Sequence, residues 1–536
     1  MHADHRIETR ELALAGLVTG AAIVLILAVG PAPGDAPAHL YRTFLVRQGA
    51  LVWDNLWYAG HYPLASYSLL YYLPAAVVGN LPLVIAAAAA STLLFGAIAY
   101  REWGRAALWP TRAFGVLAAA PVFTGLYAYS VGFTTMLAAL RAIQARRVWL
   151  AIVLAGLTVG FSPLAFAFLC LALASLAVAR RRVTRPTTVV GLALLAIAGI
   201  EFGVLVAFPM SGTYPFHLFA LICVLGVCAL GVLVARRAQS GDAIAAFFVL
   251  WGIGSVLTFA VPTALGDNWT RPRAFVFPLM LLTAILADFR PRLLVGLALA
   301  VSLVYNVAPY VLLIPYRLDG RPAHVRFWQP TLAFLHRHSS PSFRVEVVPT
   351  AAHWESYWLP RAGFALARGW YRQLDVADNA LLYAKHLDGA AYRRWLRSLA
   401  VEYVVLPSTR LDPDGGPEEA RLIRSGAAGL RLAYRDDVVS IYRLPNPTPL
   451  LTGPGEATML RFGHVEISAR VSSPGRYLLR EHYSRYWKVR GAVCVRSAPH
   501  AMTWLDVRAA GRFSLTAPSS ADALLDAAAA RRVERC

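Results

Sequence analysis

The chain has 536 residues, of which 57% are hydrophobic and 15% charged, so it is too apolar for an ordinary soluble enzyme and has the composition of a bilayer protein. The formal charge of +21 comes mostly from short arginine clusters between apolar runs, which favours membrane lipids over nucleic acid as partners. Only Lys385 and Lys488 are lysines, so the apolar half lacks the lysine of a nucleotide-binding P-loop, which argues against an ATP-driven pump. The arginine bias indicates a bacterial source with a high-GC genome, such as an actinobacterium.

The apolar runs in residues 1–315 predict a membrane all-α bundle of about eleven transmembrane helices. Several of the apolar runs are shorter than the ~20 residues of a straight crossing. Because further runs follow the first, we expect it to be a retained helix rather than a cleaved signal peptide. The runs are Leu12–Gly30, Leu81–Tyr100, Phe114–Tyr129, Gly132–Ile143, Val148–Phe161, Pro163–Ala179, Val189–Phe208, Phe216–Ala235, Ala243–Val261, Phe275–Asp288 and Leu293–Ile314.

Arginine clusters fall on alternate loops between these runs, and the positive-inside rule makes those loops cytoplasmic. The clusters are Arg101 with Arg105, Arg141 with Arg146 and Arg147, Arg180 to Arg182, Arg236 with Arg237, and Arg290 with Arg292. The N-terminus is then cytoplasmic in a multipass protein of the cell membrane. An odd number of spans places everything after Tyr316 outside, together with the loops Pro31–Pro63, Pro209–Pro215 and Pro262–Arg273.

Hydropathy falls after residue 315, and two extracytoplasmic domains are expected. Residues 316–450 predict an α+β domain and residues 451–536 a β-sandwich-like domain. The clearest elements of the first are strands at Arg344–Val348, Glu402–Leu406 and Val438–Tyr442 and a helix at Ala390–Leu399. Outside the cell, Cys494 and Cys536 are able to form a disulfide. Ligands at the spacing of a zinc site are missing, so we expect no metal.

The first outer loop, residues 31–63, is the densest polar and aromatic segment among the apolar runs. Asp35, His39 and Arg42 recur at four and three residues, so a helix that begins at Ala36 presents them on one face. The second half adds side chains suited to stacking on sugar rings and to hydroxyl recognition: Trp53, Asp54, Asn55, Trp57, Tyr58 and His61. The alternatives remain open that Asp35 only caps the helix and that the aromatic residues form an interfacial belt.

Two other segments concentrate polar side chains on the expected outer side. The outer loop GDNWTRPR contains Asp267, Trp269, Arg271 and Arg273, and arginine suits phosphate because its planar fork donates two parallel hydrogen bonds. The alternative is an interfacial anchor for the next helix. Residues 353–379 contain a second concentration, which predicts either an acceptor-binding wall or a buried α+β core.

The run from Asp35 to Pro74 resembles the first extracytoplasmic loop of GT-C class membrane glycosyltransferases, and Glu481–Val489, EHYSRYWKV, resembles the aromatic strand near the end of their outer domains. The resemblance implies a GT-C-like bundle, a C-terminal extracytoplasmic domain and transfer of a sugar from a polyprenyl-phosphate donor. It carries over one catalytic position, Asp35. Asp54 is a candidate for the second acidic residue that such proteins often have.

The sequence therefore predicts a membrane glycosyltransferase that acts on an envelope glycan, lipid or protein at the outer face, without a cofactor. Asp35 is expected to act as base, with His39 and Asp54 in the catalytic set, and Arg271, Arg273 and Arg42 to bind the donor phosphate. Substrate contacts are expected from Trp53, Asn55, Trp57, Tyr58, His61, Asp267 and Trp269. Two alternatives stay open: a transporter or flippase of a lipid-linked glycan, with a helix broken near Pro163, and a non-catalytic envelope scaffold.

Overall fold

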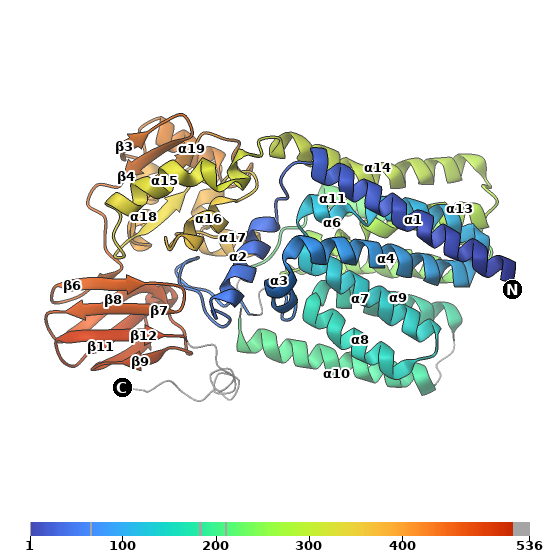
Figure 1. Cartoon of the computed structure of the whole chain (residues 1–536), viewed down its shortest axis with the longest axis horizontal. Helices are drawn as coiled ribbons and strands as arrows, with labels where there is room; N and C mark the ends of the chain where they lie inside the picture. The colour runs from blue at the N-terminus through green and yellow to red at the C-terminus, as the bar shows by residue number, and fades with distance from the viewer. Residues whose placement is uncertain (1, 65–66, 182–184, 210–211, 518–536) are drawn as a thin grey trace. The chain divides into compact units, whose positions relative to one another are not determined.

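In the computed structural model, which describes residues 2–64, 67–181, 185–209 and 212–517, the chain divides into two units (Figure 1). The first contains residues 1–33, 67–204 and 213–315, and the second contains residues 34–66, 205–212 and 316–536. The first outer loop, which the sequence analysis counted with the bundle, therefore packs mainly within the second unit.

Helices rich in Ala, Leu and Val build the first unit and lie side by side (Figure 1). They are α1 (His2–Val29), α3 (Tyr72–Val78), α4 (Asn80–Trp103), α5 (Leu108–Leu117), α6 (Ala120–Thr124), α7 (Tyr127–Gln144), α8 (Val148–Phe161), α9 (Pro163–Arg180), α10 (Arg185–Ala207), α11 (Leu218–Ala235), α12 (Asp242–Ala260), α13 (Arg273–Leu286) and α14 (Arg292–Arg317), with short 3-10 turns η1 (Gly104–Ala107) and η2 (Gly266–Thr270). Pro163 occupies the first turn of α9, and the Ser162 hydroxyl caps that helix by accepting from the Ala165 N–H (3.2 Å).

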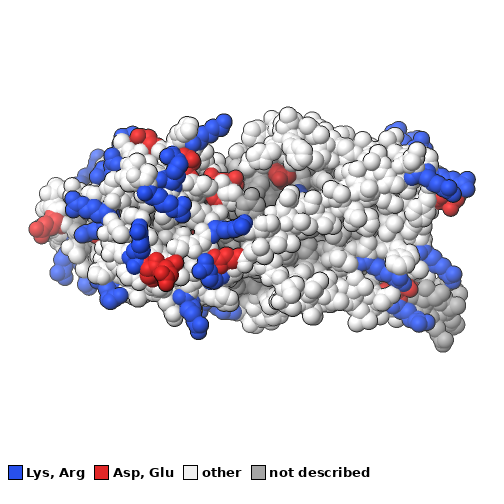
Figure 2. Space-filling view, turned by 90° about the horizontal axis from the view of Figure 1, so that it is seen from above, with Lys and Arg blue, Asp and Glu red and all other residues white. Residues whose placement is uncertain are grey.

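Among the described residues, seven helical segments are long and apolar enough to cross a membrane, so the chain is a multipass membrane protein. The prediction of about eleven crossings is not confirmed; α8, for example, is apolar but has only 14 residues. The arginine-bearing helix ends meet one another, since Gln144 at the end of α7 donates to Glu102 near the end of α4 (2.7 Å). Figure 2 shows Lys and Arg gathered at that end of the bundle, whereas its flank is almost free of charge.

The second unit begins with α2 (Ala36–Arg47) and continues with a four-stranded sheet of order β1-β2-β4-β3. Its strands are β1 (Arg344–Val347), β2 (Val401–Pro407), β3 (Arg431–Arg435) and β4 (Val439–Arg443), with β1 and β2 parallel. Helices α15 (Val325–His338), α16 (Glu355–Arg361), α17 (Arg372–Asp378), α18 (Gly389–Ser398) and α19 (Pro417–Arg424) surround it, with 3-10 turns η3 (Arg321–Ala323) and η4 (Ala380–Tyr383). Every residue of β1 and β2 is buried, as expected for strands covered on both faces. The three predicted strands and the predicted helix are therefore present.

The C-terminal part forms two four-stranded sheets, β10-β11-β8-β5 and β6-β7-β12-β9. The strands are β5 (Leu451–Thr452), β6 (Ala457–Phe462), β7 (Glu466–Val471), β8 (Gly475–His482), β9 (Lys488–Arg490), β10 (Val493–Ser497), β11 (Met502–Val507) and β12 (Gly511–Thr516), with η5 (Pro499–Ala501) before β11. Inward side chains of both sheets, such as Leu479 and Leu515, share one core, which also takes in Trp53 of the first loop. Cys494 is buried there as a thiol, and its predicted disulfide partner, Cys536, lies outside the described residues.

Candidate functional site

Two tryptophans hold the segment that carries Arg271 and Arg273 onto the bundle. Trp269 donates its indole N–H to the carbonyl of Trp251 in α12 (3.3 Å), and Trp251 donates back to the carbonyl of Trp269 (3.0 Å). Gly254 supplies the space, because a Cβ there would lie 2.5 Å from the Trp269 ring. In this structure Trp269, which was predicted to contact substrate, anchors the loop.

Arg271 and Arg273 both lie against tyrosine rings next to the start of α13. The Arg271 guanidinium lies 5.5 Å from the centroid of the Tyr129 ring and donates to the Tyr67 hydroxyl (3.2 Å). The Arg273 guanidinium lies 5.6 Å from the Tyr305 centroid and donates to Thr270 Oγ1 (2.5 Å). Within the described part of the chain, Arg273 forms no ion pair with a carboxylate. Its charge therefore stays available to an anion.

Tyr129 and Tyr305 each bury a hydroxyl that has no hydrogen-bond partner among the described residues. A buried hydroxyl left unpaired costs about 1–3 kcal/mol, so a ligand that accepts from it gains that much. Oxygen atoms of an anion accept from guanidinium N–H and phenol O–H groups alike. The two arginines and these two tyrosines are consequently a donor-rich cluster suited to a phosphate.

Thr270 and Asn306 position Arg273 from two sides. The Thr270 hydroxyl accepts from Arg273 and shares its hydrogen between the carbonyl (2.8 Å) and Oδ1 (3.0 Å) of Asp267, so Asp267, which was predicted to contact substrate, orients the arginine indirectly. The Asn306 amide of α14 donates to the Arg273 carbonyl and accepts from the Phe277 N–H (2.8 Å), two groups that bond each other in a regular helix. The sequence analysis missed Tyr129, Tyr305 and Asn306, although Asn306 is a polar residue inside an apolar run.

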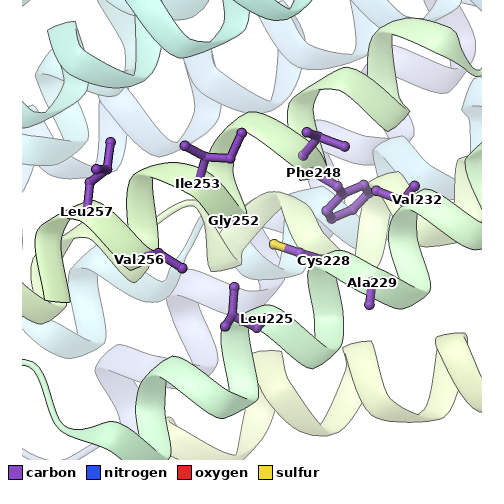
Figure 3. A pocket seen from close by; sticks show the side chains of 10 residues that line it. Leu225, Cys228, Ala229, Val232, Phe248, Gly252, Ile253, Val256 and Leu257 are labelled. Atoms are coloured by element: carbon purple, nitrogen blue, oxygen red, sulfur yellow. The ribbon is translucent and has the colours of Figure 1, made fainter. Parts of the chain in front are cut away.

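An apolar groove with a volume of about 430 Å³ lies between α11 and α12 (Figure 3). Its lining residues are Leu225, Cys228, Ala229, Val232, Phe248, Val249, Gly252, Ile253, Val256 and Leu257. Tyr305 lies near this groove: its ring is edge-on at 6.4 Å to Trp251 of α12, which precedes the lining residue Gly252, and the Arg273 guanidinium lies over its face. The first unit thus offers an apolar surface and a cationic cluster that share Tyr305 as a neighbour.

Asp35 occupies the N-cap position of α2, but its side chain makes no capping hydrogen bond. The residue is half-buried, and its carboxylate has no hydrogen bond or ion pair among the described residues. The backbone beside it is fixed, because the Trp370 indole N–H donates to the carbonyl of Gly34 (3.0 Å). The Asp35 carboxylate is therefore not used for capping and is able to accept a proton.

His39 and Arg42, which were predicted to share a face with Asp35, are both buried. The Arg42 guanidinium donates to the backbone carbonyls of Pro63 and Leu64, the latter at 3.4 Å. These bonds tie the end of the first loop to α2. In this structure Arg42 contributes to the shape of the loop and does not present its charge to solvent.

Asp54 is fully buried inside the second unit. Its carboxylate accepts from the Tyr41 hydroxyl (2.8 Å) and lies 2.9 Å from Nδ1 of His464 and 3.8 Å from Nδ1 of His61. Burial, aided by the charge of Arg42, lowers the pKa of His61 to about 4 although Asp54 opposes the shift, so His61 is neutral at pH 7. In this structure Asp54, predicted to belong to the catalytic set, and His61, predicted to contact substrate, both lie in the interior of the second unit.

The aromatic half of the loop forms core rather than a sugar-binding face. Trp53 donates to Asn55 Oδ1 (2.6 Å), and the Asn55 amide donates to the carbonyl of Gly463 (2.7 Å). Trp57 stacks on Tyr41 at 4.4 Å and donates to the carbonyl of Ser356 (3.0 Å). The predicted substrate contacts Trp53, Asn55, Trp57 and Tyr58 are each at most 2% exposed. The interfacial-belt alternative fails for the same reason.

Residues 353–379 form a buried network of charges, as the core alternative predicted. Arg368 pairs with Asp375 (2.5 Å) and lies near Glu419 (3.4 Å) and Glu346 (3.6 Å). Burial raises the pKa of Glu419 to about 7, with the Arg368 charge opposing the shift. Because one guanidinium faces three carboxyl groups, the network holds protons at neutral pH that a solvated cluster would release.

Comparison with protein families finds no family that matches this chain, and comparison with curated proteins finds no match either. Among solved structures, the chain is similar to the arabinofuranosyltransferase AftD from mycobacteria, a cryo-electron microscopy structure of a single-substitution variant, with 14% identity and a TM-score of 0.45. The similarity covers 84% of this chain and 42% of AftD, so the chain spans less than half the length of that protein.

Proposed function

We propose that the protein is a membrane glycosyltransferase that transfers a sugar from a polyprenyl-phosphate donor to a cell-envelope glycan, lipid or protein. The observation that carries the proposal is the cluster of Arg271 and Arg273 over Tyr129 and Tyr305. It combines the positive charge of Arg273, which forms no ion pair in the described part of the chain, with two buried tyrosine hydroxyls that have no described partner, inside an apolar bundle. A lipid phosphate matches both features, because its head is anionic and its chain is apolar.

The proposed reaction assigns one role to each group. The acceptor hydroxyl oxygen bonds to the anomeric carbon of the donor sugar, and the bond from that carbon to the phosphate oxygen breaks. The phosphate leaves on its lipid, and its added negative charge is stabilised by Arg271 and Arg273. The hydroxyl proton passes to the Asp35 carboxylate, which has no competing partner in its own unit. We also propose that the chain crosses the membrane about eleven times and that its C-terminal domains lie outside the cell.

The groove between α11 and α12 supports a lipid-linked donor over a soluble one. Its lining is almost entirely apolar, so an isoprenoid chain packs against it by van der Waals contact without burying an unpaired polar group. A nucleotide sugar offers no such chain. The proposal therefore expects transfer from polyprenyl-phosphate sugars and none from nucleotide sugars.

The test compares Asp35→Asn with Asp388→Asn in purified protein. Asp388 is also an N-cap, but its side chain accepts from the Ala391 N–H (2.7 Å), so its substitution by asparagine, another good cap, controls for the loss of a helix-capping carboxylate. We expect Asp35→Asn to lower sugar transfer about 100-fold or more, as for loss of a general base, and Asp388→Asn to leave it unchanged. Full transfer by folded Asp35→Asn would remove Asp35 from the mechanism.

A transporter or flippase of a lipid-linked glycan is the second candidate, and Glu201 is the observation that favours it. This carboxyl group lies within α10 and is 8% exposed, and ionisable residues inside membrane helices often mark transport pathways. Under this reading, Glu201→Gln abolishes movement of a fluorescent lipid-linked glycan across proteoliposomes. Under the transferase proposal, sugar transfer survives that change. Unaltered cellular function of Asp35→Ala would instead favour a scaffold.

A further inference from the structure

The sheet β6-β7-β12-β9 has one face in the sandwich core and one face open to solvent. Along β7, Ile467, Ala469 and Val471 are buried, whereas the alternate residues point outward. Strand β12 follows the same period, with Phe513 and Leu515 buried. Side chains of one strand face therefore line up with those of the next at about 4.8 Å spacing.

The register places cations together on the outward face. Arg470 of β7 lies directly opposite Arg512 of β12, and both are exposed. In the next row Arg490 of β9 lies opposite Ser514, and in the row after it Lys488 lies opposite Thr516. Rows are about 6.7 Å apart, so the four cations cover a patch that spans three adjacent strands, β7, β12 and β9. We name these residues, Arg470, Arg490, Arg512 and Lys488, the basic face.

No carboxylate among the described residues balances the charge of the basic face. None of its four side chains forms an ion pair with a carboxylate in the described part of the chain; the neighbouring Glu466 is used by Arg461 (3.0 Å). Like charges directly opposite on a sheet are destabilising. The outer face of the other sheet differs, since Asp506 there lies 2.7 Å from Arg476 and 3.1 Å from Arg496. The imbalance is confined to one side of the sandwich.

The side chains of this face favour one kind of polyanion. Hydroxyl groups of Ser468, Ser514 and Thr516 alternate with the cations and suit the hydrogen-bonding needs of sugar hydroxyls. The named rows contain no aromatic side chain on which a nucleic-acid base would stack, and no large apolar side chain that would enter a bilayer. The cations lie in three successive rows along the sheet, which fits an extended polyanion better than a single compact anion.

From these observations we infer that the basic face is a binding site for an acidic polysaccharide, whose carboxylate or phosphate groups pair with Arg470, Arg512, Arg490 and Lys488. The site lies wholly within the C-terminal sandwich and is independent of the proposed sugar transfer. It gives the outer region a way to hold an anionic envelope polymer.

The test measures binding of polygalacturonate, with dextran as the uncharged comparison, to the full chain in detergent. The double variant Arg470→Gln/Arg512→Gln is matched by Arg476→Gln/Arg496→Gln, which removes the same charge from the other sheet. We expect the first double variant to bind polygalacturonate at least about tenfold more weakly and the control to bind within about twofold of the unaltered protein. Binding should weaken as salt rises, and dextran should not bind.

Three results would overturn the inference: no polygalacturonate binding at low salt, equal loss in both double variants, or tighter binding to phosphatidylglycerol vesicles or oligothymidine than to polygalacturonate. The melting temperature of Arg470→Gln/Arg512→Gln should not fall, because the change removes a repulsion. If the melting temperature does fall, the double variant Arg470→Lys/Arg512→Lys replaces it in the test. This variant keeps both positive charges, so the inference requires that it keep most of the polygalacturonate binding.

Discussion

Replacing Arg273 by glutamine tests the phosphate-binding role with little damage to the fold. Arg273 makes a hydrogen bond to Thr270 and a cation–π contact with Tyr305, which together contribute roughly 1–2 kcal/mol to stability. Because no described carboxylate pairs with it, the change leaves no unpaired buried acid behind. Melting temperature should therefore fall by only a few degrees.

The effect on donor use should be larger than the effect on folding. A hydrogen bond between a guanidinium and a phosphate contributes about 1.5–3 kcal/mol. At about 1.4 kcal/mol for each factor of ten, Arg273→Gln lowers kcat/KM for a polyprenyl-phosphate sugar by about 10- to 150-fold. If the contact strengthens as the phosphate leaves, kcat falls as well as the apparent affinity.

The assay follows sugar transfer from a labelled polyprenyl-phosphate sugar by protein in nanodiscs. Arg290→Gln is the control, because Arg290 is 78% exposed in its side chain and belongs to an arginine cluster at a helix end, where it lies 3.6 Å from Asp288. The reasoning is refuted if Arg273→Gln retains the full kcat/KM, or if Arg290→Gln loses as much.

Three further outcomes are expected. Gly60→Ala should cost about 2 kcal/mol or more in unfolding free energy, because its φ is +97° and the new Cβ would lie 2.2 Å from the Trp53 ring; an unchanged denaturation midpoint contradicts this. The raised pKa of Glu419, about 7, means that the folded state holds its proton, so stability falls by up to about 1.4 kcal/mol per unit as pH rises from 4.5 to 7; Glu419→Gln should flatten that part of the profile, and parallel profiles would refute it. Trp370→Phe frees the Gly34 carbonyl beside the proposed base and should lower kcat about tenfold, with a loss of about 1–3 kcal/mol in unfolding free energy from the unpaired carbonyl; an unchanged kcat in the folded variant rules out this positioning role.

Local patterns predicted the elements of this fold well. The residue pattern placed β1, β2 and β4 to within one residue at each end, because strand propensity along a short segment depends only on neighbouring residues. Helix count was harder. The sequence analysis counted short apolar helices such as α8 as membrane crossings. In the structure, seven helical segments among the described residues are both long enough and apolar enough to cross.

The candidate site depended on contacts that sequence cannot show. Asp54 looked like an exposed acid in a polar loop, but its partner His464 lies 410 positions later in the chain. Trp57 looked like a sugar-stacking residue, but Ser356, 299 positions away, accepts its N–H. Arg273 remained available because no such distant acid reaches it within the described chain. The sequence therefore identified the polar and aromatic residues of the loop, but it did not show that the fold buries them.

Sugar transfer by the purified protein is the measurement that tests the central claim most directly. The protein in nanodiscs is given a panel of polyprenyl-phosphate sugars, a panel of nucleotide sugars and an envelope extract as acceptor. The account predicts transfer from at least one polyprenyl-phosphate sugar, lowered about 10- to 150-fold in Arg273→Gln and kept in Arg290→Gln, and no transfer from nucleotide sugars. Transport of a lipid-linked glycan without transfer from any donor in the panel would contradict it.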